Sequence, residues 1–323
     1  MKMFLASIGC TLLSVTSAFS FGPQGHKAIW AAAQAALTPK AALMVSQILN
    51  HDKLAMTAVW LDNVRTAEVH GTGPLKADAE ALGFISSFPA NTNWHFVDLP
   101  LGAPGYDLNS VFASADDVVH ALNFCLSVLE DKDTSLSKRI ALRVIVHLVG
   151  DIHQPLHCAS GYFDVTDESH PALKTDVQGA MAVRQFTDRG GNELRFGPHK
   201  MDELHGMWDG ALVELAAGGT GSYLELAEIL KDTATSTQVN DAGDFHDWAG
   251  QWASESVKLA NDAYRSLTFG TAKLNAGKSK IESIQLGFTN GIDTYEEAEK
   301  DVALQQMTKA SIRLANLLNK VLK

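Results

Sequence analysis

The chain lacks the features of a membrane protein and of a disulfide-built scaffold. Its longest apolar stretch, Met3–Val15, is shorter than the about 20 residues needed to span a bilayer, so we expect no membrane insertion. Only three cysteines occur in 323 residues, too few for a disulfide framework. A disulfide between Cys125 and Cys158 and two buried free thiols are both compatible with the sequence.

Positive charge is also scarce. The chain has 26 Lys and Arg against 37 Asp and Glu, a formal net charge of −11. Proteins that bind duplex nucleic acid through its backbone need a basic surface, so this balance argues against that function. It does not argue against a site whose positive charge comes from bound cations, because those ions would be the largest local charges.

Residues 1–20 have the pattern of a secretion signal. Lys2 is followed by an apolar stretch and then by small residues, the order found in signal peptides. Cleavage fits after Ala18 or after Ser20, and the second site makes Phe21 the new N-terminus. We therefore expect an exported protein, periplasmic or secreted, in which residues 21–323 form one domain.

Helical patterns dominate the rest of the chain. Thr38-Pro39 is typical of a helix start, and Ser114 with Asp117 resembles a capping box. Predicted helices cover about 38–49, 118–129, 136–153, 222–231, 244–265 and 294–322. Strand patterns at 182–187 and 193–196 flank a turn and predict a small hairpin, while 159–181 and 266–292 are predicted as long connections. The fold class is therefore mainly α with a small β-hairpin.

The most informative segment places a histidine and a carboxylate on one stripe of an apolar helix. His147 and Asp151 are four residues apart, so both side chains point to one place. An unpaired carboxylate in such a core costs several kcal/mol, and a metal ion would compensate it. His157 can return to the same place from the loop that begins at Pro155. The alternative is a buried His–Asp hydrogen-bonded pair without a metal.

A second histidine–carboxylate pair, His205 and Asp209, has the same spacing in a segment predicted to be helical. Histidines or carboxylates also stand beside aromatic or glycine-rich segments at His26, Asp62 and His95. Each alone is typical of a core residue, but together they favour a metal centre with imidazole and carboxylate ligands. Such ligands suit zinc and similar divalent ions, with positions left open for water.

Further motifs accompany these ligands along the chain, after an aromatic residue five positions before His26. They are Trp60-x-Asp62-x-x-Arg65, Trp94-His95-Phe96, His147-x-x-x-Asp151-x-His153-Gln154-Pro155-Leu156-His157, Asp188-x-Gly190-Gly191-Asn192, Leu204-His205-x-x-Trp208-Asp209, Trp252-Ala253-Ser254-Glu255-Ser256 and Arg313-Leu314-Ala315-x-Leu317-Leu318-Asn319. In this order they resemble the zinc-dependent type I nucleases: the secreted fungal single-strand nucleases, the plant bifunctional nucleases and their bacterial relatives. The resemblance runs from Phe21 to the C-terminus. It implies the helical fold that this family shares with bacterial zinc phospholipase C.

The resemblance also implies three zinc ions. Carried over by position, the ligands are Asp62, His95, His147 and Asp151 for one ion; Asp151, His26 and the amino group and carbonyl of Phe21 for its neighbour; and His157, His205 and Asp209 for the third. An N-terminal ligand favours cleavage after Ser20 and predicts an enzyme that is inactive until exported.

Three positions depart from the family pattern. Phe21 stands where most relatives have Trp, which should affect packing rather than metal binding. The 159–187 connection is longer than in compact relatives and is expected to reshape the substrate cleft. Ser311 replaces a common Gly, a change expected to concern packing alone.

The implied activity is hydrolysis of single-stranded DNA and RNA to 5′-phosphorylated products, with removal of 3′-phosphate from mononucleotides. Asp62 is expected to orient or deprotonate the nucleophile. Arg65 neutralises Asp62 or contacts phosphate, or else forms a structural salt bridge. Phe96 is expected to stack on an unpaired base, with core packing as the alternative, and Asn192 either touches substrate or only shapes its turn.

Two other functions are compatible with the sequence. A zinc phospholipase C would use the same fold, but that branch typically ends its ligand set with His-x-x-x-Glu, where this chain has Asp209. A non-catalytic zinc-binding exported protein would have coordinatively closed sites, whereas ten ligating groups over three ions leave positions open. No obligate protein partner is evident.

Overall fold

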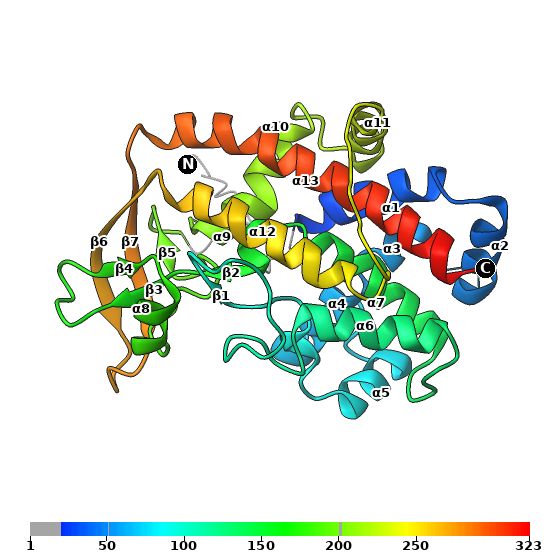
Figure 1. Ribbon diagram of the computed structural model, residues 1–323, viewed down its shortest axis with the longest axis horizontal. Helices are drawn as coiled ribbons and strands as arrows, with labels where there is room; N and C mark the ends of the chain where they lie inside the picture. Colours follow the sequence, from blue (N-terminus) through cyan, green and yellow to red (C-terminus); the bar gives the residue numbers. More distant parts are fainter. Residues whose placement is uncertain (1–20, 51, 200–201) are drawn as a thin grey trace, which may run out of the picture.

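The computed structural model describes residues 21–50, 52–199 and 202–323, so the predicted signal segment lies outside the described residues. The described part is mainly helical, as predicted (Figure 1). The helices are α1 (Gly22–Ala35), α2 (Pro39–Leu49), α3 (Leu54–Thr57), α4 (Trp60–His70), α5 (Ala79–Ser87), α6 (Val118–Leu129), α7 (Lys138–Asp151), α8 (Val177–Ala182), α9 (Leu204–Gly206), α10 (Leu212–Ala216), α11 (Tyr223–Ala234), α12 (Trp248–Tyr264) and α13 (Ile292–Val321). Short turns of other helix types are η1 (Asn91–Asn93), η2 (Pro155–His157) and the π-helical η3 (Met207–Ala211).

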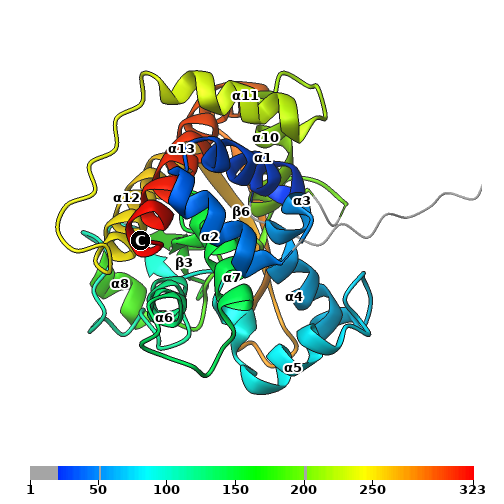
Figure 2. The same cartoon turned by 90° about the vertical axis from the view of Figure 1, so that its right-hand side faces the viewer.

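Helix α7 forms the centre of the molecule. Ser137 caps its N-terminus by accepting a hydrogen bond from the Ile140 amide, and every residue from Ile140 to Asp151 is buried. Helices α6, α13, α2, α4 and α1 pack around it, and Figure 2 shows α7 next to α2 near the middle of the molecule, with α5 and α11 on opposite sides. A helix covered on all sides must be apolar all round, which is why the polar His147 and Asp151 on it need a specific explanation.

Three small sheets lie at one end of the helical body (Figure 1). Strand β1 (Leu99–Pro100) pairs in parallel with β2 (Ala159–Ser160), and β3 (Tyr162–Asp164) pairs antiparallel with β4 (Ala172–Lys174). Strand β7 (Ile281–Phe288) is central to the third sheet, antiparallel to β6 (Leu267–Leu274) and parallel to β5 (Leu194–Arg195). Because Leu194 pairs with Ile284, this sheet ties the turn at 188–192 to the C-terminal part of the chain.

The predicted position of the hairpin is wrong. Residues 182–187 and 193–196 do not pair, because Ala182 ends α8 and the 194–195 strand pairs with β7 instead. Among the described residues the consecutive antiparallel pairs are β3–β4 and β6–β7, and the longer of them, β6–β7, lies within the 266–292 stretch that was predicted as a connection. The 159–181 stretch likewise contains β2, β3, β4 and α8 rather than a plain loop.

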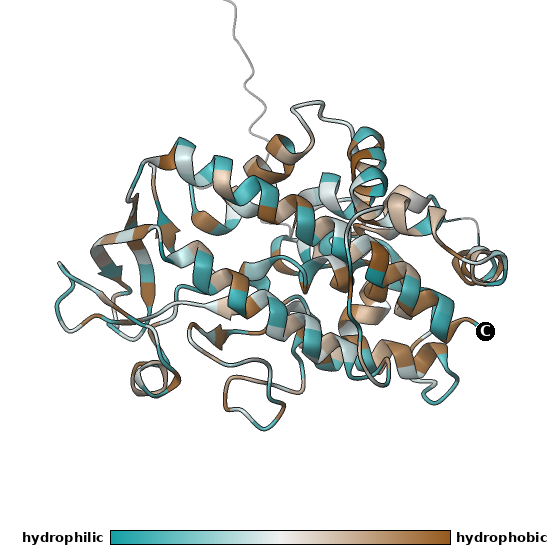
Figure 3. Ribbon diagram, turned by 45° about the horizontal axis from the view of Figure 1, so that its top comes forward, coloured by the Kyte–Doolittle hydropathy of each residue, from teal (hydrophilic) through white to brown (hydrophobic). Residues whose placement is uncertain are grey.

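The long helices confirm the helical predictions, with shifted ends. Helix α6 starts where expected, but Asp117 rather than Ser114 is its cap and accepts the amides of Val119 and His120. Helix α12 begins at Trp248, four residues after the predicted start at Asp244. The C-terminal helix alternates hydrophilic and hydrophobic segments along its length (Figure 3), as expected of a helix with one face on the core.

The two cysteines of the described chain are not bridged. Cys125 on α6 and Cys158 after η2 are both free and fully buried, so of the two states left open by the sequence the structure has the free thiols. The Cys158 Sγ lies 3.3 Å from the Ile152 carbonyl oxygen, to which it donates. None of the described helices is both long and apolar enough to cross a bilayer.

Candidate metal centre

Five buried side chains from four segments meet at the C-terminal end of α7; we call them the paired cluster. His26 comes from α1, Asp62 from α4, His95 from the loop after η1, and His147 and Asp151 from α7. The Asp151 carboxylate is central: its oxygens lie 3.2 Å from His26 Nε2, 2.9 Å from His95 Nδ1 and 3.4 Å from His147 Nε2. His147 Nε2 also lies 3.3 Å from Asp62 Oδ1. The structure therefore brings together all five side chains predicted for the first two ions.

The orientation of His147 is fixed by a backbone group. Its Nδ1 lies 2.8 Å from the Ala58 carbonyl oxygen, which can only accept, so Nδ1 carries the proton and Nε2 faces two carboxylates. Burial lowers the pKa of His147, but the carboxylates of Asp151 and Asp62 outweigh it and raise the pKa to about 9. A positive charge is thus favoured between these groups, and a proton or a divalent cation can provide it.

His157, His205 and Asp209 form a second group, the distal cluster. The Nδ1 atoms of the two histidines lie 2.7 Å from the carbonyl oxygens of His95 and Gly190, so both Nδ1 atoms donate. Their Nε2 atoms then face each other at 3.1 Å, and Asp209 Oδ2 lies 3.3 Å from His205 Nε2. Burial lowers the pKa of His157 to about 4 and that of His205 to about 3. At neutral pH two lone pairs therefore converge, as the ligands of a cation do. Burial raises the pKa of the adjacent Asp209 carboxyl, which a bound cation would hold in its charged form.

The buried polar atoms of both clusters fit metal ions. Each of the three groups His26–Asp62–His147, His95–His147–Asp151 and His157–His205–Asp209 has one ligand atom per residue within 4.8 Å of the others. Several of these atoms make no hydrogen bond among the described residues, namely His26 Nε2, Asp62 Oδ2, His147 Nε2, Asp151 Oδ1 and Asp209 Oδ2. Buried polar atoms are normally hydrogen-bonded, and ligation of a divalent cation would satisfy all five.

Two glycines allow these groups to approach. At Gly150 on α7 a Cβ atom would lie 2.6 Å from His26 Nδ1, so only glycine lets the His26 ring stack on His147 at 4.0 Å. Gly22 has φ +53°, and a Cβ there would lie 2.6 Å from the Asp209 carbonyl oxygen. The start of α1, including the fully buried Phe21, is thereby held against both clusters.

A shell of hydrogen bonds orients the ligands. Gln154 donates from Nε2 to Asp209 Oδ1 at 2.9 Å, which leaves Oδ2 for the cluster. Next to it, His153 accepts a hydrogen bond from Arg313 Nη1 at 3.0 Å, and its carbonyl accepts one from Gln306. Hydrogen bonds such as that from Gln154 fix ligand geometry in metal sites, while Arg313 and Gln306 attach the neighbouring His153 to α13.

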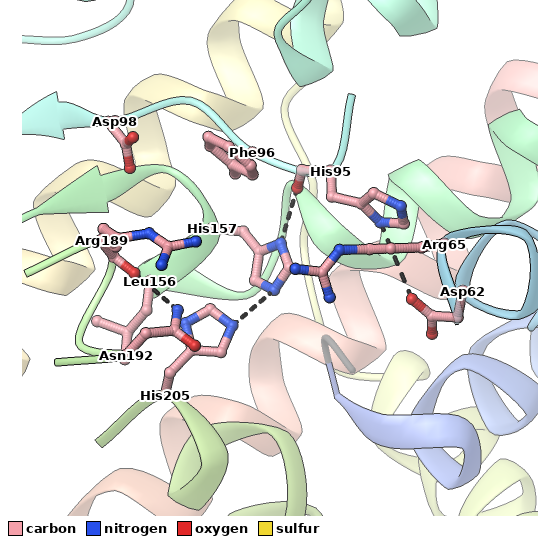
Figure 4. A pocket seen from close by; sticks show the side chains of 10 residues that line it. All are labelled: Asp62, Arg65, His95, Phe96, Asp98, Leu156, His157, Arg189, Asn192 and His205. Carbon is pink, nitrogen blue, oxygen red and sulfur yellow. Dashed lines mark hydrogen bonds and ion pairs between the residues drawn. The ribbon is translucent and has the colours of Figure 1, made fainter. Parts of the chain in front are cut away.

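Residues of both clusters line one cavity (Figure 4). Its lining combines metal-cluster residues with others, namely Asp62, Arg65, His95, Phe96, Asp98, Leu156, His157, Arg189, Asn192 and His205. The four residues predicted for catalysis and substrate contact, Asp62, Arg65, Phe96 and Asn192, all lie on it.

The cavity lining helps to decide between the alternative roles that the sequence left open for Phe96, Arg65 and Asn192. Phe96 is half-buried and lines the cavity, and no described aromatic ring packs on it. Arg65 makes no ion pair with any described residue, and it points into the cavity (Figure 4). Asn192 both lines the cavity and donates to the Arg189 carbonyl at 2.7 Å, so it shapes its turn as well.

Asp98 and Arg189 also line the cavity but were not predicted as site residues. Asp98 stands two positions after Phe96, and Arg189 stands three positions before Asn192 inside a quoted motif. Only tertiary packing turns both side chains toward the cavity. Asp98 Oδ1 accepts a hydrogen bond from Ser160 Oγ at 2.6 Å, and the same Oγ accepts the Gly190 amide at 2.7 Å. Burial raises the pKa of Asp98.

The chain matches known proteins over nearly its whole length. The family model described as S1/P1 Nuclease matches residues 21–323. Similar proteins include Nuclease S1 from Aspergillus oryzae, 22% identical over 329 residues that cover 99% of this chain and 98% of that protein. Nuclease P1 from Penicillium citrinum is 23% identical over 316 residues, 93% and 97% of the two chains. Endonuclease 2 from Arabidopsis thaliana is 25% identical over 332 residues, 96% and 93%.

Proposed function

The chain belongs to the S1/P1 nuclease family, and on that premise we propose that it is an exported hydrolase that uses three zinc ions to cleave single-stranded DNA and RNA. The products carry 5′-phosphate, and 3′-mononucleotides are a second substrate class. The observation that carries the proposal is the meeting of two buried histidine–carboxylate clusters on one cavity beside an accessible aromatic ring.

The ligands are assigned from the two clusters and the family resemblance. Within the paired cluster, Asp62, His95, His147 and Asp151 would hold one ion, while His26 and Asp151 would hold the second with the amino group and carbonyl of Phe21. The distal cluster would hold the third through His157, His205 and Asp209. Imidazole and carboxylate ligands without cysteine suit zinc.

The residues around the cavity then divide the work of phosphodiester hydrolysis. Bound zinc ions would activate water and neutralise phosphate charge. Asp62 has one carboxylate oxygen free of hydrogen bonds at the cavity, where it can orient an attacking water and accept its proton. Arg65, which has no described carboxylate partner, is placed to donate to a phosphate oxygen.

A preference for single strands follows from the position of Phe96 in the cavity lining. A base can stack on Phe96 only when it is unpaired, and each stacking contact is worth about 1–3 kcal/mol whatever the base. The net charge of −11 gives no general attraction for duplex. Both effects favour single-stranded DNA and RNA over duplex.

Export accounts for the N-terminal ligand. Removal of residues 1–20 would create a free amine at Phe21, which lies buried at the start of α1. The precursor, whose Phe21 nitrogen is an amide, would lack this ligand. We therefore expect activity only after cleavage, in the periplasm or outside the cell.

A zinc phospholipase C on the same fold is the alternative function, and a non-catalytic zinc protein is a third. The relatives described above are named nucleases and endonucleases, and residues of both clusters line a cavity in which a substrate could bind. Both observations favour the nuclease.

The proposal is tested by comparing substrates before and after metal removal. Purified mature protein is assayed on heat-denatured DNA, duplex DNA and phosphatidylcholine, then again after chelation and after zinc is returned. We expect hydrolysis of denatured DNA in preference to the other two, loss with chelator and recovery with zinc. Activity indifferent to the chelator, or selective for the phospholipid, would contradict the proposal.

A further inference from the structure

Arg189 is a cation of the cavity that the ligand assignment does not use. Its side chain is 64% exposed and its only described ion pair is with Glu193, at 3.3 Å. Figure 4 shows its guanidinium pointing into the cavity on the side of Asp98 and Phe96, whereas Arg65 enters from the side of Asp62. The two arginines therefore stand at different ends of one site.

The loop that carries Arg189 is held by hydrogen bonds from its neighbours Asp188 and Gly190 to other segments of the chain. Arg189 itself has φ 55°, a conformation that costs a residue with a side chain about 1–3 kcal/mol and persists only when surroundings impose it. The preceding Asp188 is fully buried, where its carboxylate accepts the amides of Gly161 and Gly191 and the Tyr264 hydroxyl at 2.8 to 3.1 Å. The Gly190 amide is bound in turn by Ser160. The backbone of Arg189 is thus held in place, and its side chain starts from a fixed position beside the cavity.

We propose that Arg189 binds a phosphate of the substrate. The phosphate is the 5′-phosphate of the nucleotide whose base lies against Phe96 and Asp98, the part of the cavity lining that we call the Phe96–Asp98 wall. This inference rests on the proposed function. A nucleotide with its base on that wall and its 3′-phosphate at the metal clusters has one further phosphate, on its 5′ side, if it belongs to a polymer. A guanidinium is the side chain best suited to bind such an oxyanion. The subsite would distinguish a link of a nucleic acid chain from a free 3′-mononucleotide.

The test compares two dimers that differ in one group. Thymidine dinucleotide with a 5′-phosphate and the same dimer without it each contain one cleavable bond. For the wild type we expect kcat/KM to be about tenfold higher with the 5′-phosphate, the size of one charge-assisted contact at an accessible site. In Arg189→Gln the ratio should fall below about twofold, and in Arg189→Lys it should stay intermediate because the charge remains.

A matched control removes a charge elsewhere. Lys231 on α11 is also exposed and ion-paired within its own segment, with Glu228 at 2.6 Å, and does not line the cavity. Lys231→Gln makes the same change in net charge and should keep the tenfold ratio. If a dimer is not hydrolysed, it is used as an inhibitor of the hydrolysis of single-stranded DNA. The ratio of the inhibition constants of the two dimers then replaces the ratio of their kcat/KM values.

The outcomes separate the inference from the proposed function. The inference is contradicted if the wild type cleaves single strands but has the same kcat/KM for the dimers with and without the 5′-phosphate. It is also contradicted if Arg189→Gln keeps the wild-type ratio of these two values. An equal loss in Lys231→Gln would assign the effect to overall charge and also overturn it. A wild type without zinc-dependent activity on any single strand would instead contradict the proposed function.

Discussion

The Nε2 atoms of His157 and His205 lie 3.1 Å apart, and each ring donates its other nitrogen to a backbone carbonyl. Two lone pairs therefore face each other in a buried place where Asp209 adds a carboxylate oxygen. Such an arrangement is repulsive unless a cation lies between the groups. The two carbonyls belong to His95 and Gly190, next to Phe96 and Arg189, so the cavity walls themselves orient this cluster.

Loss of one distal ligand should remove one ion. His205→Ala is expected to lower the zinc content of the mature protein from three ions to two per chain. Hydrolysis of denatured DNA should fall by more than about 100-fold, since loss of even an outer partner costs 10–100-fold in metal sites. Elemental analysis and rate measurements check this, with His170→Ala, whose side chain is 84% exposed, as the control. Retention of three ions with near-normal rates would refute the assignment.

Ser160 should act as a positioning residue. Its buried hydroxyl donates to the half-buried Asp98 and accepts the buried Gly190 amide. Ser160→Ala leaves that amide without a partner, at a cost of about 1–3 kcal/mol. We expect a lower free energy of unfolding and a raised KM for single-stranded DNA, with a smaller change in kcat.

The control for this variant is Ser311→Ala. The Ser311 hydroxyl is buried too, but it donates only to the Thr308 carbonyl of its own helix, at 2.8 Å. KM should not change in this control. An equal rise of KM in both variants would show that the effect at Ser160 is general destabilisation.

The ion pairs at Glu255 should make stability depend on acid pH. Burial raises the pKa of this carboxyl, but Lys309 and Arg313 outweigh it and lower the pKa to about 2. Because the folded pKa lies below the unfolded value, the stabilisation is complete above about pH 4.5 and is lost as the pH falls toward 2, with an upper limit of about 3 kcal/mol.

Urea unfolding of wild type and Glu255→Gln measures this contribution. The difference in unfolding free energy should be constant from pH 5 to 8 and shrink steadily below about pH 4.5. Taking the difference cancels acid release of metal ions, which both proteins share. A difference that grows toward acid would contradict the prediction.

The cysteines should titrate as two inaccessible thiols. Burial raises the pKa of Cys125 and of Cys158, and both side chains are fully buried. A thiol reagent at pH 8 should therefore find none in the native mature protein and two after denaturation. No thiol after denaturation without reductant would show a disulfide instead.

The two histidine–carboxylate pairs could be predicted because their chemistry is local in sequence, whereas the distant ligands His26, Asp62 and His95 were assigned through the family resemblance. The spacing of His147 and Asp151, and of His205 and Asp209, fixes each pair on one helix face, and the surrounding apolar helix shows that the pair is buried. The long helices were predictable for the same reason, since their periodicity lies in consecutive residues.

The β-structure and the outer cavity were not predictable because they depend on distant parts of the chain. Leu194 pairs with Ile284, some ninety positions further on, and no local pattern encodes that partner. Arg189 faces the cavity only because Asp188 is bound by Tyr264 and by Gly161 from other segments. In each case tertiary contacts decide what sequence periodicity leaves open.

The most direct test is the metal content and metal position in mature protein that begins at Phe21. Elemental analysis should find three zinc ions per chain. Anomalous diffraction should place two of them among His26, Asp62, His95, His147 and Asp151, and the third among His157, His205 and Asp209. A folded, active protein without bound transition metal, or with no anomalous signal at these side chains, would contradict the account.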